Sequence, residues 1–171
     1  MLTYDLNDVI IDGTVFSRLL SYCFQRSEFF SFTVPEIPTA DRTTLQRELS
    51  RYTYAVITTD RWFNFITLPD NPLKRIIYTV NDETLFILNK YCRRLFLFDN
   101  RCPLSSWNQT LEDLCFFSDG KLFLGTVSHE YICEVFPPNS IIKSELFSIY
   151  PHWKETEDST EQIMLSDYLS R

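Results

Sequence analysis

The chain has 171 residues, of which 44% are apolar and 16% aromatic, so it can bury a core and does not read as a disordered chain. Its net charge of −7 argues against a general affinity for nucleic-acid backbones or anionic membranes, which need clustered Lys and Arg. Three glycines are too few for a Gly-rich phosphate loop or a dinucleotide fingerprint, and no linker divides residues 1–171 into domains.

In the first half of the chain, helical spacing of apolar residues alternates with aromatic and β-branched runs. Proline and Asp-rich stretches separate these segments. In chain order we expect a short strand near Val9–Ile11, a helix from Thr14 to about 26–27, a strand at Glu28–Val34, a helix capped by Thr39 or Asp41 that reaches Tyr52, and strands at Tyr54–Thr59 and Arg61–Leu68 around a turn at Asp60.

The second half begins after a loop at residues 69–72. Asn81 or Asp82 is placed to cap a helix, and Asn139 or Ser140 to cap another. In chain order we expect a strand at Arg75–Val80, a helix reaching Cys92, a central strand at Leu95–Phe98, a loop at 99–110, a helix ending near Ile149, and a terminal helix at Glu161–Leu169.

Residues 111–136 carry the clearest structural signal. Asp119-Gly120 lies between the apolar runs Leu114–Ser118 and Lys121–Thr126, and this pair is typical of a type I′ hairpin turn. Tyr131–Phe136 adds a third antiparallel strand that Pro137-Pro138 ends. The sequence therefore predicts an α+β fold, with a mostly antiparallel sheet and about four helices packed on it.

The cysteines favour a reducing compartment. There are five, an odd number, with wide gaps and no CxxC pair. The N-terminal stretch lacks a basic region, and no apolar run reaches the length of a membrane span. We therefore expect a cytoplasmic protein without a membrane segment.

One tight cluster of chemical groups follows the hairpin. Ser128, His129, Glu130 and Cys133 supply a nucleophile, a base and an acid within six positions. This pattern is the basis of one hypothesis, a small hydrolase or transferase that uses His129 with Glu130, Ser128 or Cys133. The structural interpretation is favoured, in which Ser128 caps the next element, His129 packs and Cys133 is core, because no GxSxG motif accompanies the serine.

Other combinations of chemical groups have weaker support. A zinc site would need His129, Cys133 and His152 to meet, and no spacing indicates it. The N-terminal aspartates lack the glycine and glutamate of an EF-hand loop. Basic and aromatic side chains that would suit single-stranded nucleic acid fit core strands better. We therefore predict no metal, no cofactor and no direct nucleic-acid partner. The aspartates are Asp5, Asp8 and Asp12, and the basic and aromatic residues are Trp62, Phe63, Phe65, Arg93, Arg94 and Arg101.

The C-terminal segment 154–171 turns acidic after Pro151. Tryptophan is a favoured anchor at protein interfaces, and an acidic surface can meet a basic cleft. The alternative for both loop tryptophans is that they cover the edge of the core. The predicted partner-binding residues are Trp107, Trp153, Glu155, Glu157 and Asp158.

The block LCFFSDGKLFLGTVSHEYICEVFPP resembles a stretch in small uncharacterised cytosolic proteins of Gram-positive bacteria and their phages. That resemblance covers about a sixth of the chain and implies no catalytic motif. In size and acidity, the chain is also similar to immunity proteins of polymorphic toxins and to phage-borne anti-defence inhibitors. The second resemblance implies a non-enzymatic inhibitor that binds a protein target. A structural subunit that buries its exposed aromatics on assembly is a third hypothesis.

Overall fold

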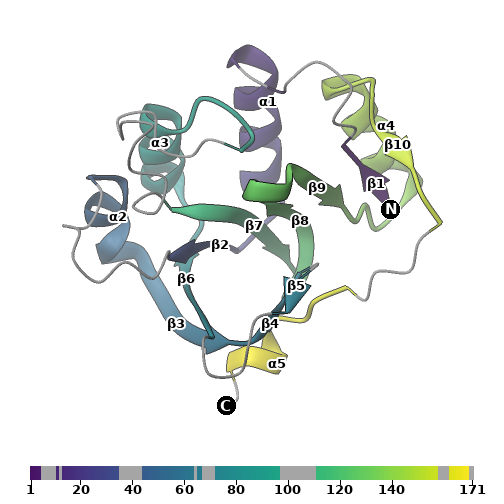
Figure 1. Cartoon of the computed structure of the whole chain (residues 1–171). Helices are drawn as coiled ribbons and strands as arrows, with labels where there is room; N and C mark the ends of the chain where they lie inside the picture. Colours follow the sequence, from purple (N-terminus) through teal and green to yellow (C-terminus); the bar gives the residue numbers. More distant parts are fainter. Residues whose placement is uncertain are drawn as a thin grey trace.

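The computed structural model describes residues 1–4, 11, 13–34, 44–63, 65–66, 72–96, 111–157 and 162–169. Their central feature is an eight-stranded antiparallel sheet (Figure 1). Its strands are β1 (Leu2–Thr3), β2 (Phe29–Val34), β3 (Thr53–Thr59), β6 (Leu73–Thr79), β7 (Glu112–Ser118), β8 (Lys121–Val127), β9 (Ile132–Val135) and β10 (Lys154–Glu155), in the spatial order β10-β1-β9-β8-β7-β2-β6-β3.

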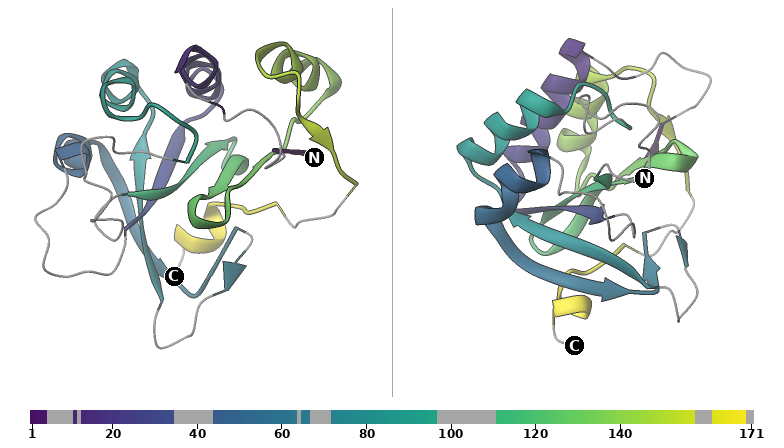
Figure 2. Two further views of the ribbon diagram at one scale, coloured as in Figure 1. Left: turned by 45° about the horizontal axis from the view of Figure 1, so that its top comes forward. Right: turned by 60° about the vertical axis from the view of Figure 1, so that its left-hand side comes forward.

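Four helices pack on one face of this sheet, as the sequence predicts (Figure 2). Each helix places an apolar stripe on the strands, and together they enclose the larger core. These helices are α1 (Gly13–Phe24), α2 (Thr44–Leu49), α3 (Asp82–Tyr91) and α4 (Ser140–Ile149), and the 3-10 helix η1 (Ser50–Tyr52) follows α2. The α+β class with a mostly antiparallel sheet is therefore confirmed.

A smaller core lies on the opposite face of the sheet. It is covered by a second, two-stranded sheet of β4 (Arg61–Trp62) and β5 (Phe65–Ile66) and by helix α5 (Ser166–Leu169). Gly125 of β8 allows this cover to approach closely, because a Cβ there would lie 2.7 Å from two ring atoms of Phe63.

Local signals explain several element boundaries. Asp119 and Gly120 both have positive φ, as a type I′ turn requires, and they join β7 to β8. The Asn81 side chain accepts from Thr84 N at 2.9 Å, and Thr84 Oγ1 accepts from Asn81 N, so a capping box begins α3. Asn139 caps α4 by accepting from Ile142 N. The predicted capping roles of Asn81 and Asn139 are confirmed.

Two predicted elements in the middle of the chain are wrong. Arg61–Leu68 is not one strand, because β4 and β5 form their own small hairpin around Phe63. Leu95 and Phe96 form a turn, not the start of a central strand, and Leu95 N donates to Ile11 O. Leu95 is still buried, because it packs under the helices.

Differences are also found at the two ends. Strand β1, which lies between β9 and β10, is not predicted by the sequence pattern. Gln162–Leu165 is not helical, although a helix was predicted there, and only Ser166–Leu169 of that prediction forms one. The expected strand at Val9–Ile11 and the caps Thr39 and Asp41 fall wholly or mostly outside the described residues. No helix among the described residues is long and apolar enough to cross a membrane.

Candidate functional site

Ser128, His129 and Glu130 form a 3-10 helix, η3 (Ser128–Glu130), between β8 and β9. The Ser128 Oγ atom accepts from Asp113 N at 2.9 Å, and Ser128 N donates to Asp113 Oδ1 at 2.8 Å. Glu130 is exposed, and the His129 side chain lies outside the described part of the structure. The Ser128 hydroxyl is therefore engaged in a structural contact that fixes Asp113.

Cys133 lies on β9 in the helix-side core and is only 1% exposed. Burial raises the pKa of its thiol well above the ordinary value, so the protonated form persists. A protonated thiol is a poor nucleophile. Because the Ser128 hydroxyl is directed to Asp113 and Cys133 to the helices, the structure does not bring these two groups together.

A buried ion pair that the sequence analysis missed lies on the opposite face. Arg75 of β6 is fully buried, and its Nη2 atom is 3.5 Å from Asp113 Oδ2. The Arg75 guanidinium stacks 4.3 Å from the Trp62 ring, and Thr33 Oγ1 donates to Asp113 Oδ2 at 2.7 Å. Burial lowers the pKa of Arg75 to about 10, which still leaves it charged at neutral pH.

The Arg75–Asp113 ion pair lies where several strands of the large sheet meet. Asp113 has a φ of 52° at the point where the β2–β7 register shifts, so it occupies a β-bulge. Its carboxylate connects β2, β6, β7 and η3, and the Trp62 ring covers the cation. The strand pattern RIIYTV indicated Arg75 only as the start of a strand. Arg75 is two positions before the inward-facing Ile77, so the two side chains lie on the same face of the strand. That spacing was the available signal that Arg75 is buried.

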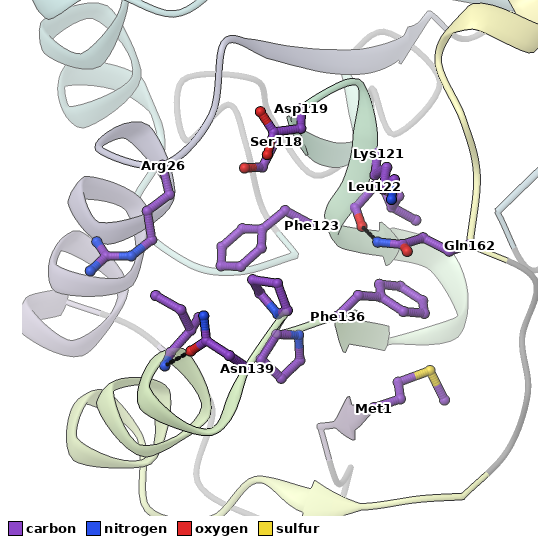
Figure 3. A pocket seen from close by; sticks show the side chains of 13 residues that line it. Met1, Arg26, Ser118, Asp119, Lys121, Leu122, Phe123, Phe136, Asn139 and Gln162 are labelled. Atoms are coloured by element: carbon purple, nitrogen blue, oxygen red, sulfur yellow. Dashed lines mark hydrogen bonds between the residues drawn. The ribbon is translucent and has the colours of Figure 1, made fainter.

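One hollow on the described surface is what we call the hairpin–α4 pocket. It has a volume of about 600 Å³ and lies between the β7–β8 turn, the end of α1 and the start of α4 (Figure 3). Figure 3 shows the Phe123 ring near its centre, with Arg26 on one side and Lys121 and Gln162 on the other. It is lined by Met1, Arg26, Ser118, Asp119, Lys121, Leu122, Phe123, Phe136, Pro137, Pro138, Asn139, Ile142 and Gln162.

The prolines and the hairpin turn create this hollow. Phe136 N still bonds to Phe123 O, but Pro137 and Pro138 have no N–H and end the pairing of β9 with β8. The chain then turns into the Asn139 cap of α4. The start of β8 is left beyond the end of β9. The half-buried Phe136 and the buried Phe123, which is 3% exposed, line the resulting gap.

One cation of the pocket is already neutralised. Arg26 Nη2 lies 2.7 Å from Glu145 Oε2, and the guanidinium stacks 3.6 Å from the Tyr22 ring. Tyr22 OH donates to the same Glu145 oxygen at 2.6 Å. Burial and this carboxylate raise the pKa of the Tyr22 hydroxyl. Arg26 is thus held in a fixed position, with its charge balanced.

The acidic segment borders the pocket through Met1. Met1 and Thr156 exchange backbone hydrogen bonds, with Thr156 N donating to Met1 O at 3.2 Å. Glu155 and Glu157 beside Thr156 are exposed, and Glu155 pairs with Lys143 of α4. These two predicted contact residues therefore lie at the surface next to a pocket-lining residue.

The remaining predicted contact residues are Trp153, Trp107 and Asp158. Trp153 is only 4% exposed and packs edge-on against Tyr150 in the helix-side core, so its expected role as a surface anchor is wrong. It covers the core, because the chain turns inward after Pro151. Trp107 and Asp158 lie outside the described residues.

Within the described residues, no group of three or more His, Cys, Asp and Glu side chains is placed to hold a metal ion. No protein family, curated protein or solved structure was found to match the chain.

Proposed function

We propose that this chain is a non-enzymatic, acidic interaction protein that binds and blocks a protein target, in the manner of toxin-immunity proteins and phage anti-defence inhibitors. The observation that carries the proposal is the position of the hairpin–α4 pocket beside the exposed Glu155 and Glu157. An apolar floor with a polar rim is the usual anatomy of a protein contact site.

The chemistry of the pocket supports binding. Its floor consists of Phe123 and Phe136, and its rim carries Ser118, Asp119 and Lys121. Aromatic side chains supply contact area, while rim charges fix the orientation of a partner. Ser128 and Cys133, in contrast, are engaged in internal contacts away from this hollow.

The acidity of the chain supports a partner with a basic cleft. Opposite charges accelerate encounter between two proteins, and the effect weakens as salt screens it. We place this interaction in the cytoplasm, which suits the four described cysteines Cys23, Cys92, Cys115 and Cys133, all of them present as thiols.

The experiment first isolates the target by affinity capture from the host and mass spectrometry, and then measures its binding to purified variants. Glu157→Lys should weaken binding about tenfold, and salt should weaken wild-type binding. Glu130→Lys is the matched control, because it changes the net charge equally from an exposed position at the far end of β8 and β9.

If Glu157→Lys and Glu130→Lys weakened target binding equally, the loss would come from net charge alone. The acidic border of the pocket would then not be the contact site. Ile142→Glu in the pocket wall tests the apolar part, with exposed Ile141→Glu as its control. Binding that survives Ile142→Glu and Glu157→Lys unchanged would contradict the proposed site.

A further inference from the structure

The strand β3 forms the outer margin of the large sheet (Figure 1). Among the described residues, its ladder runs to β6 alone, with a regular register from Ala55 to Thr59. An edge strand presents a row of backbone N–H and C=O groups on its outer side. At seven residues, β3 is long enough to pair with another strand along that side.

Natural proteins blunt such edges with charges, prolines or very short strands. The other margin of this sheet follows that rule, because β10 has two residues, Lys154 and Glu155, and both are charged. β3 does not follow it. Its sequence, TYAVITT, has no charge, no proline and no glycine, and it is rich in β-branched residues.

Apolar side chains are exposed on both faces of β3. Val56 is 52% exposed and lies opposite Ile76, on the side of the helices. Tyr54 is 53% exposed, and its ring packs 4.5 Å from Phe29, which belongs to the opposite face. A strand added beside β3 would cover apolar surface above and below the sheet.

We propose that β3 pairs antiparallel with β3 of a second copy of this chain, about a two-fold axis, so that the two sheets continue into one. An uncharged strand is self-complementary, since pairing with its own copy sets no like charges opposite each other within the strand. The contact is small, so the dimer forms in a concentration-dependent equilibrium.

The charge of the chain sets the salt dependence of this dimer. Two copies at −7 each repel one another, and salt screens that repulsion. Salt should therefore strengthen the dimer. It should weaken binding to a basic target, so the two associations are distinguishable by the sign of the salt effect.

Sedimentation velocity or light scattering on the full chain tests the proposal. The wild-type mass should rise from monomer toward dimer with concentration, and more so at high salt. Val56→Lys should reduce dimerisation at least tenfold, because it places two charges at the pairing edge. Ile141→Lys, at a 69% exposed site on α4, is the matched control and should dimerise like the wild type.

A second edge variant covers the case in which Val56→Lys folds poorly. Thr58→Glu places a carboxylate opposite Lys74 of its own chain, which favours the fold while charging the edge. A wild type that stays monomeric up to about 1 mM would overturn the proposal. Edge variants that dimerise like the wild type, or a control that loses the dimer equally, would also overturn it.

Discussion

Asp113 shows how one side chain organises several strands. Its carboxylate accepts from Thr33 Oγ1 and Ser128 N and faces the fully buried Arg75. A buried charge is costly when its counter-charge is removed, whereas an intact pair is close to neutral for stability. The residue is therefore needed because Arg75 is present, and the two form one structural unit beneath Trp62.

We expect Asp113→Asn to lower the free energy of unfolding by about 3 kcal/mol, because the neutral amide leaves the buried Arg75 cation without this counter-charge. Asp119→Asn is the matched control. Asp119 also has positive φ but is exposed in the hairpin turn, and its change should stay within about 0.5 kcal/mol. Urea denaturation measures both, and equal losses would contradict the role assigned to the ion pair.

At the scale of elements, the segment Gln162–Leu169 closes the second core. Leu122 N donates to Ile163 O and Leu165 N to Gly120 O, so the segment pairs with the start of β8. Leu165 is 2% exposed, and Tyr168 packs 5.0 Å from Trp62. A short segment with few backbone bonds thus depends on two side chains for its position.

Leu165→Ala should cost about 2–4 kcal/mol of unfolding free energy, because it leaves a cavity under this segment. Leu169→Ala removes the same atoms one helical turn later, where the side chain is 37% exposed, and should cost less than about 1 kcal/mol. Chemical denaturation compares the two variants. Similar losses would show that the segment is not anchored through Leu165.

The elements that the sequence predicts well carry local signals. The Asp119-Gly120 turn and the asparagine caps are fixed by backbone chemistry within a few residues. Leu95–Phe96 and Gln162–Leu165 were mispredicted because short apolar runs suit a strand, a helix or a buried turn equally. In both places the choice depends on a distant backbone partner, Ile11 in the first case and Gly120 in the second.

At the scale of the whole molecule, the pocket could not be predicted. Its walls come from Met1, the end of α1, the β7–β8 turn, the start of α4 and Gln162, which are brought together only by the finished sheet. The acidic border was visible in the sequence, because charge density needs no tertiary contact. Trp153 was predicted to lie at the surface but is buried. The sequence around a tryptophan that follows a proline is the same whether the side chain points outward or inward.

The stability of the whole molecule should fall at alkaline pH. Burial raises the pKa of the Cys23, Cys115 and Cys133 thiols above their usual 9.0. The unfolded chain then releases protons near that value while the folded chain retains them. Stability is therefore full below about pH 9 and is lost as the pH rises further, by about 1.4 kcal/mol per pH unit for each thiol.

Urea denaturation between about pH 8 and about pH 10 measures this slope. Cys133→Ala should make the slope shallower by roughly one thiol's share, even though it lowers stability at neutral pH. Val135→Ala, at a buried and non-titrating neighbour on β9, should lower stability without changing the slope. A slope that is unchanged in Cys133→Ala would contradict the assignment.

The place of β1 has a consequence for how the chain folds during its own synthesis. Thr3 bonds to Lys154, 151 residues later, and β1 lies between β9 and β10. Domains begin to fold while the ribosome is still extending them. β1 leaves the ribosome long before β9 and β10, so it cannot complete its pairing until the chain as far as β10 has been made. The side of the sheet that borders the pocket is therefore completed only after β10 has been made, so the hairpin–α4 pocket forms later than the strands at the centre of the sheet.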